Sequence, residues 1–215
     1  MSARRCATPS APWNNPGMTA AVASRRPLAL AIVLILTGAT GWYASFRLTL
    51  DKIAVLISPD AVLECNVSVV VQCGKNLDSW QGAILGFPNP ILGLGGFVAP
   101  IAVGVALLAG ATFDRWFWVV FNIGVAAAFG FCLWLAYQSI FNLSTLCLWC
   151  MLVWSMVIPM FWTLTLRNAR EGVFGSRLMP LGERLYSWVP AITVLGYLII
   201  AVVAQLRLDV LATLV

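Results

Sequence analysis

The sequence contains no histidine among its 215 residues. Histidine is the commonest metal ligand and the one side chain that ordinarily changes charge near neutral pH. Its absence excludes haem held by histidine, nearly all zinc catalysis and the usual proton-shuttling base. Catalysis by this chain would therefore depend on other side chains.

Charge is also scarce. Charged residues make up 10% of the chain and hydrophobic residues 61%, with a mean hydropathy of +0.91. A soluble domain carries about 25% charged residues. A chain this apolar cannot cover itself with polar surface, so it is predicted to be an integral membrane protein. The net charge of +5 comes from arginines that flank apolar runs, so no nucleic-acid partner is expected.

Long apolar runs are what the sequence has in abundance. Each is long enough to cross the hydrocarbon core, which is about 30 Å thick. The predicted fold is an all-α integral membrane protein, a four-helix transmembrane bundle core plus a fifth transmembrane helix. The expected spans are 28–46, 90–113, 116–137, 146–166 and 186–206. They form a transmembrane domain over 27–215, preceded by a disordered tail at 1–26 that is rich in Pro, Ala, Ser and Asn.

The distribution of basic residues predicts the orientation. With the N-terminus in the cytoplasm, the cytoplasmic side holds Arg4, Arg5, Arg25, Arg26, Arg115, Arg167, Arg170, Arg177 and Arg184. The other side holds only Arg47, Lys52, Lys75 and Arg207. The positive-inside rule therefore favours a cytoplasmic N-terminus and an extracytoplasmic C-terminus. The long loop at 47–89 and the turn before Cys147 then both face outward.

Two of the six cysteines have simple interpretations. Cys6 lies in the predicted cytoplasmic tail as a free thiol, and Cys132 is expected to be buried in the third span. The other four, Cys65, Cys73, Cys147 and Cys150, are predicted to face the same oxidising compartment, where disulfide chemistry is their natural use.

Cys147 and Cys150 form a Cys-x-x-Cys motif at the start of the fourth span. Residues three apart share one face of a helix. We expect Ser144 to be the N-cap, which would put Cys147 in the first turn, where the helix dipole favours a thiolate. The motif is also compatible with a metal site or with two buried apolar residues. Zinc would have to recruit all four thiolates without any histidine.

Cys65 and Cys73 have seven residues between them in the long loop. Such a pair is compatible with a structural disulfide. A second pair on the same side of the membrane favours a relay instead, in which a thiolate attacks, a mixed disulfide forms and a second thiol resolves it.

Together these motifs resemble the vitamin K epoxide reductase family, and most closely its bacterial members that make disulfide bonds. The resemblance covers about residues 28–166 and is carried by Cys65 and Cys73, Ser79-Trp80, Gly86-Phe87-Pro88-Asn89 and Leu146-Cys147-Leu148-Trp149-Cys150. The other quinone-linked disulfide enzyme, DsbB, has its Cys-x-x-Cys in the first outer loop and the spaced pair in the second, the reverse of this order.

The resemblance implies a role for each of the four cysteines. Cys65 would exchange with a partner protein, and Cys73 would shuttle between Cys65 and Cys147. Cys150 would lie against a membrane quinone of the menaquinone, ubiquinone or phylloquinone type and pass electrons to it.

The resemblance also implies a quinone pocket. Ser79 and Asn89 match the family's polar pocket positions, although each is also suited to a turn or a helix start. Four aromatic residues could form walls of the pocket or belong to the interfacial aromatic belt: Trp80, Phe87, Trp149 and Trp154. Some members have a tyrosine at the position of Trp154, and an indole N–H donates a hydrogen bond but cannot accept one.

Some family members carry a fused thioredoxin-like domain after the fifth span, where this chain ends at Val215. The expected thiol partner is therefore a separate, extracytoplasmic thioredoxin-fold (DsbA-like) protein, with the enzyme itself in the inner or plasma membrane. Two alternatives stay open: reduction of a quinone epoxide by the same thiols, and a non-catalytic membrane protein with a structural loop disulfide. A transporter is disfavoured because the spans contain almost no polar residues.

Overall fold

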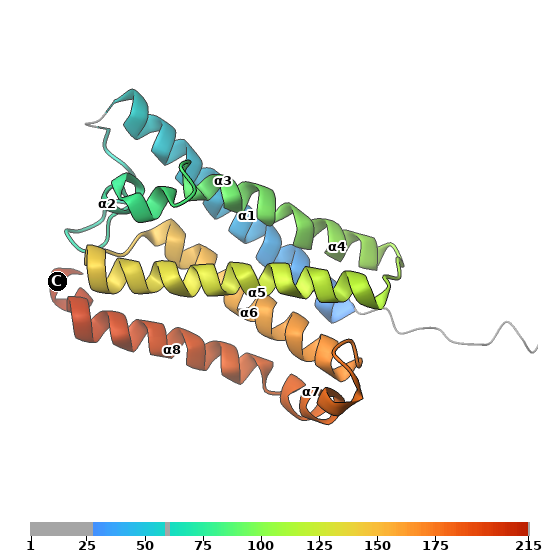
Figure 1. Cartoon of the computed structure of the whole chain (residues 1–215). Coiled ribbons are helices and arrows are strands. Elements are labelled where there is room, and N and C mark those ends of the chain that lie inside the picture. Colours follow the sequence, from blue (N-terminus) through green and yellow to red (C-terminus); the bar gives the residue numbers. More distant parts are fainter. Residues whose placement is uncertain (1–27, 59–60, 215) are drawn as a thin grey trace, which may run out of the picture.

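The computed structural model describes residues 28–58 and 61–214, so the tail predicted at 1–26, with Cys6, lies outside the described residues. The described chain is helical apart from its connections and one isolated β-bridge (Figure 1). In chain order the elements are α1 (Leu28–Ile57), α2 (Gly74–Asp78), η1 (Trp80–Ala83), α3 (Asn89–Gly96), α4 (Val98–Leu108), α5 (Arg115–Tyr137), η2 (Gln138–Leu143), α6 (Leu148–Arg170), η3 (Ser176–Leu178), α7 (Met179–Tyr186), α8 (Val189–Leu208) and α9 (Val210–Leu214).

Five helical segments are long and apolar enough to cross a membrane. They are Leu28–Ile57, Asn89–Leu108, Arg115–Leu143, Leu148–Arg170 and Val189–Leu208. Both termini of the described chain lie at the ends of the bundle, and its C-terminal end is beside the end of α5 (Figure 1). The prediction of an all-α membrane bundle with a fifth helix is therefore confirmed.

Helices α1 and α6 form the centre of the bundle. α1 packs against α3, α4 and α6, while α5, α7 and α8 pack against α6. Leu30, Ala31 and Leu34 of α1 and Leu164 of α6 are almost completely buried. The fifth transmembrane helix, α8, therefore covers an outer side of a core that the other four build.

Helix α1 continues to Ile57, well past the predicted end of the first span at residue 46. The expectation placed the end at the first charged residues. Those side chains do not stop the helix because they find partners from the following loop: Arg47 binds Glu64, and Lys52 binds the Leu77 carbonyl and Asp78. The connection that follows is correspondingly shorter than the predicted loop at 47–89.

The second transmembrane segment is divided into α3 and α4 at Phe97. Pro100 follows three residues later, and a proline both lacks an N–H and crowds the carbonyl four residues before it. Glycines let this broken segment approach α1 closely: a Cβ on Gly104 would lie 2.9 Å from the Ala31 carbonyl oxygen. Gly104 therefore lies against α1, whereas Gly95 has open space beside it.

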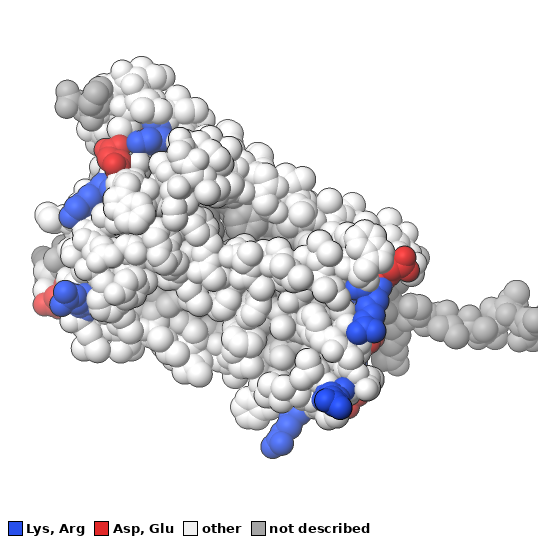
Figure 2. All heavy atoms as spheres, viewed as in Figure 1, with Lys and Arg blue, Asp and Glu red and all other residues white. Residues whose placement is uncertain are grey.

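Polar groups gather at the two ends of the bundle. On the face shown in Figure 2, the charged side chains lie at both ends and leave the middle uncharged. At the end where α6 finishes, Arg167 lies over the Trp118 ring at 4.3 Å, and Asn168 Nδ2 donates to Asn122 Oδ1 at 3.1 Å. The cysteine motifs lie at the opposite end, where α1 finishes and α6 begins.

Candidate active site

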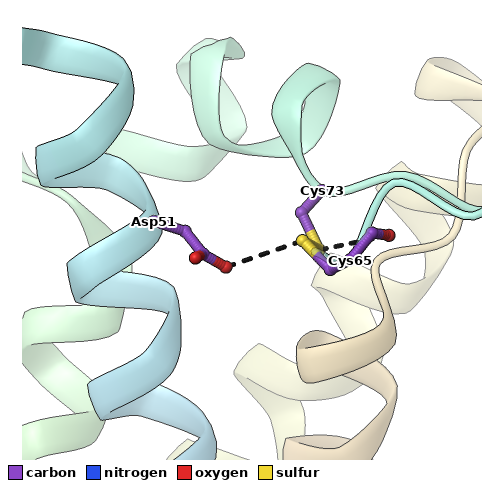
Figure 3. Close-up of side chains that lie close together, drawn as sticks. All are labelled: Asp51, Cys65 and Cys73. Carbon is purple, nitrogen blue, oxygen red and sulfur yellow. Dashed lines mark hydrogen bonds between the residues drawn. A yellow bond between two sulfur atoms is a disulfide. The ribbon is translucent and has the colours of Figure 1, made fainter. Parts of the chain in front are cut away.

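Cys65 and Cys73 are joined by a disulfide in the segment between α1 and α2. Both residues are buried, at 1% and 0% exposure. Figure 3 shows the disulfide facing Asp51 of α1, whose Oδ2 lies 3.5 Å from Cys65 Sγ. The loop disulfide is therefore enclosed between the end of α1 and the rest of the cysteine loop.

A single β-bridge brings this loop beside the start of α6. Val71 pairs in parallel with Leu146, through bonds from Leu146 N–H to the Val70 carbonyl and from Gln72 N–H to the Leu146 carbonyl. Cys147 directly follows Leu146, and Cys73 lies two residues after Val71. The bridge thus sets the register in which the two cysteine motifs meet.

Asn76 provides a second tie between the same two segments. Its Nδ2 donates to Thr145 Oγ1 at 3.1 Å, and its Oδ1 accepts from Ser139 Oγ at 2.9 Å. All three residues are buried, and an unpaired buried amide would cost about 1–3 kcal/mol. The hydrogen bonds therefore hold α2 against the turn that leads into α6.

The two cysteine pairs meet at Cys73 and Cys147. Their Sγ atoms are 3.3 Å apart, and Cys147 is fully buried. This separation is close to van der Waals contact, so a Cys147 thiolate could attack Cys73 after a small movement. The loop disulfide therefore lies directly beside the Cys-x-x-Cys motif.

The prediction that Ser144 caps α6 is wrong. Ser144 adopts the left-handed conformation, with φ 51°, and ends η2. Cys147 itself is the N-cap of α6, and its Sγ accepts the Cys150 N–H at 3.4 Å. The tight turn after η2 takes up the residues that were expected to begin the helix. The capping sulfur therefore accepts a backbone N–H and lies at the positive end of the helix dipole.

Cys150 lies one turn further along α6 and lines a cavity of about 650 Å³. The cavity is walled by α3, α4, α5 and α6, and its lining is mostly apolar, with Phe97, Phe121 and Phe131 among the aromatic residues. Cys132, predicted to be buried in the third span, is 7% exposed and lines the same cavity. Cys150 thus lies between the contact of Cys73 with Cys147 and an apolar cavity.

The predicted quinone-binding residues divide into two groups. Ser79, Asn89 and Trp154 all line the cavity, and Trp154 is 4% exposed. Trp80 and Phe87 are not among the lining residues; Trp80 is 65% exposed and packs edge-on against Trp134. The aromatic wall therefore comes from Phe97, between α3 and α4, and from α5 and α6 rather than from the loop before α3.

Ser79 and Asn89 also hold the loop together. Ser79 Oγ donates to the Asn76 carbonyl and accepts the Gly82 N–H, which caps η1. Asn89 Nδ2 donates to the Gln81 carbonyl, and its Oδ1 accepts the Ile84 N–H. The Asn89 amide has a second N–H, whereas the single hydroxyl proton of Ser79 is already used.

Sequence reasoning did not single out Asp51, Asn76, Gln81 or Gln138. Gln81 and Gln138 line the cavity, and Gln81 Oε1 is buried without a hydrogen-bond partner in the described structure. Nothing in the sequence distinguishes these amides from ordinary loop residues. Asp51 does carry a signal, since it is an acidic residue on a helix that is otherwise mostly apolar.

The ligand-forming atoms of Asp51, Cys65 and Cys73 all lie within 4.8 Å of one another, a spacing that a metal site could use. Two of these atoms are bonded to each other as a disulfide. A metal binds cysteine as the thiolate, so this bonding leaves the carboxylate as the one ligand of the three.

Two cysteine pairs in exchange distance, at one end of a transmembrane helical bundle, define a membrane thiol–disulfide oxidoreductase. The comparison with protein families agrees with this class. The model of the Vitamin K epoxide reductase family matches residues 32–165, more than half of the chain, and the protein belongs to that family. Family members are membrane oxidoreductases that use cysteine pairs and quinones. A search of curated proteins finds no match.

Proposed function

We propose that the protein is a quinone-dependent thiol oxidase that reoxidises a separate thioredoxin-fold protein and so drives disulfide formation. The observation that carries the proposal is the 3.3 Å separation between the Sγ atoms of Cys73 and Cys147. This contact joins the loop disulfide to a helix pair whose second member lines an apolar cavity.

The relay begins when a thiolate of the partner attacks Cys65. The new bond joins the partner sulfur to Cys65, the Cys65–Cys73 bond breaks, and Cys73 leaves as a thiolate. Cys73 then attacks Cys147 in the oxidised Cys147–Cys150 pair, and Cys150 leaves as a thiolate. The second of these attacks occurs between two sulfur atoms that the loop bridge and the capping turn already hold 3.3 Å apart.

The second half of the relay restores the loop disulfide. The second thiol of the partner loses its proton and displaces Cys65, which takes up a proton and becomes a free thiol, and the partner leaves with a disulfide. Cys65 then attacks Cys73, the Cys73–Cys147 bond breaks, and Cys147 leaves as a thiolate. Two electrons now reside on Cys147 and Cys150. This is the bonding that the structure has, with Cys65–Cys73 oxidised and the other pair free.

The cavity beside Cys150 fits a quinone. Ligand pockets for molecules of this size measure about 300–1,000 Å³ and are mainly apolar with a few polar groups, and the cavity of about 650 Å³ has this character. When bound there, a quinone supplies an acceptor for two electrons and two protons. The apolar walls would exclude water, Asn89 would offer its second N–H to an oxygen, and Gln81 Oε1 would accept from a hydroxyl.

The location of the site supports the proposed partner and orientation. All four cysteines lie at the end of the bundle with fewer basic residues, which the positive-inside rule assigns to the extracytoplasmic side. There the partner would be an oxidising, DsbA-like thioredoxin-fold protein and the membrane would be the inner or plasma membrane. In this orientation the N-terminus would be cytoplasmic and the C-terminus extracytoplasmic.

The test is reduction of a short-chain ubiquinone and of a menaquinone analogue by the purified protein, with a reduced thioredoxin-fold protein as electron donor. We expect wild-type protein to turn over and Cys150→Ala to lose at least about a hundredfold in rate, because the last thiol before the acceptor is gone. Cys6→Ala, which removes a cysteine outside the relay, serves as the matched control and should keep the wild-type rate.

Two results would contradict the proposal. One is a full rate of quinone reduction in Cys150→Ala. The other is a wild-type protein that reduces neither quinone although its loop disulfide exchanges with the donor.

A further inference from the structure

The carboxylate of Asp51 occupies an unusual place in the protein. Asp51 is 8% exposed, and its Oδ2 lies 3.5 Å from Cys65 Sγ (Figure 3). A disulfide sulfur carries no proton and gives a carboxylate nothing to accept. Cys65 therefore donates no hydrogen bond to Asp51 while the disulfide is formed. When Cys65 is a thiol, its S–H can donate to this carboxylate.

No cation neutralises this carboxylate in the described part of the chain. Arg47, one turn earlier on α1, forms its ion pair with Glu64, and Lys52 binds the Leu77 carbonyl and Asp78. Arg47 and Glu64 are the charged groups that act on Asp51 electrostatically, one from its own helix and one from the cysteine loop. A buried carboxyl group without an ion pair is costly to the fold, and such groups gather at functional sites.

Cys65 has a matching requirement. In the last step of the proposed relay it must lose a proton before it can attack Cys73, because the thiolate is the nucleophile. Its sulfur is 1% exposed, so hydroxide and buffer bases reach it poorly. A base within the protein would remove this obstacle, and Asp51 is the carboxylate in contact with the sulfur.

We propose that Asp51 is the proton acceptor for Cys65 when the loop disulfide closes. The proton moves from Cys65 Sγ to Asp51 Oδ2, and the Cys65–Cys73 bond forms. The bond that breaks joins Cys73 to its previous partner, which is Cys147 in the relay and glutathione in the experiment below. The departing sulfur leaves with the electron pair. In the reverse direction Asp51 returns the proton to Cys65 as it leaves Cys73. This role rests on the proposed function, but closure of the loop disulfide can be measured without quinone or partner.

The experiment follows closure directly in the full chain. In a Cys147→Ala/Cys150→Ala background the reduced protein is mixed with oxidised glutathione and quenched with acid at intervals. Mass spectrometry of peptides then measures the species that carries glutathione on Cys73. Its decay reports the attack of Cys65, with glutathione thiolate as the leaving group.

We expect Asp51→Asn to slow this decay at least about tenfold at pH 7, within the range of general-base effects. The deficit should shrink towards pH 9, where the much higher hydroxide concentration offsets the poor access of hydroxide to Cys65. Asp51→Glu keeps a carboxylate and should recover a substantial part of the rate. Glu64→Gln, a change of the neighbouring carboxylate that pairs with Arg47, should close at nearly the rate of the parent.

The outcomes separate the role of Asp51 from a structural one. A purely structural side chain would leave a deficit that is the same at every pH, and this result, or closure within twofold of the parent in Asp51→Asn, would overturn the proposal. Thermal unfolding and the final yield of the Cys65–Cys73 disulfide show whether each variant is folded. Failure of quinone reduction would contradict the proposed function and leave this measurement standing.

Discussion

At the scale of single residues, the central atom of the site is the sulfur of Cys147, which contacts two other cysteines. Cys147 Sγ accepts the N–H of Cys150 and also lies against Cys73. As the N-cap of α6, it is held outside the first turn and so points back towards the loop. A cysteine inside the first turn, as expected from the sequence, would lie on the helix surface beside Cys150.

This arrangement predicts a spontaneous cross-link. In a Cys65→Ala/Cys150→Ala variant, Cys73 and Cys147 are the remaining relay thiols, and their sulfurs need to approach from 3.3 Å to the bond length of about 2.0 Å. We expect most molecules purified in air to contain a Cys73–Cys147 disulfide. Peptide mass spectrometry under non-reducing conditions measures its fraction.

The matched control for this cross-link is the variant Cys65→Ala/Cys147→Ala/Cys150→Ala. In it, Cys132 is the cysteine that Cys73 would have to pair with. Cys132 lies inside α5 and packs in the bundle core, away from the loop cluster that contains Cys73. No disulfide should form in it. A Cys73–Cys147 variant that stays as two free thiols would show that the loop and α6 do not hold these sulfurs together in solution.

The grouping of four cysteines into two pairs at one end of the bundle could be predicted from the sequence, but the geometry of their contact could not. The spacing of Cys65, Cys73, Cys147 and Cys150 was enough to indicate two pairs on one side. The cap position was not predictable, because Ser144 is a good N-cap residue by type and the left-handed turn that displaces it depends on η2.

At the scale of elements, helix α1 has two functions along its length. Its first part fills the bundle core with Leu30 and Leu34, and its last turns carry Asp51 to the loop disulfide. Hydropathy identified the first part and ended the span at Arg47. A charge marks where a helix leaves the hydrocarbon, not where its hydrogen bonding stops, so the extension that carries Asp51 was missed.

The close approach of α4 to α1 predicts an asymmetry between two glycines. Gly104→Ala would put a methyl group 2.9 Å from the Ala31 carbonyl oxygen and 2.7 Å from a side-chain carbon of Ile35. We expect overpacking to cost about 1–3 kcal/mol in the free energy of unfolding. Thermal unfolding in detergent measures the change.

Gly95→Ala is the control, since nothing lies within 4 Å of its added Cβ. Alanine favours a helix over glycine by about 1 kcal/mol, so this variant should be as stable as the parent or more stable. Equal loss of stability in both variants would mean that contact with α1 is not what constrains Gly104.

At the scale of the whole molecule, the two cysteine pairs lie at one end of the bundle and most of the described arginines lie at the other. The sequence predicted this polarity because apolar length and arginine position are local properties. It did not predict the bridge between Val71 and Leu146. That pairing joins residues far apart in the chain through a contact too short to leave a periodic pattern, yet it fixes the register of the two cysteine motifs.

The distribution of charge predicts the orientation in the membrane. Among described residues, the end opposite the cysteines carries Arg115, Arg167, Arg170, Arg177 and Arg184. Translocating that end would oppose the positive-inside rule, so we expect the cysteine end to face outward. After Val215, a fused alkaline phosphatase should then be active and a fused green fluorescent protein should not fluoresce. Fusions after Ser176, in the connection between α6 and α7, should give an inactive phosphatase and a fluorescent protein. Fluorescence from the Val215 fusion would place the cysteines in a reducing compartment, where the relay could not supply disulfides to an exported partner.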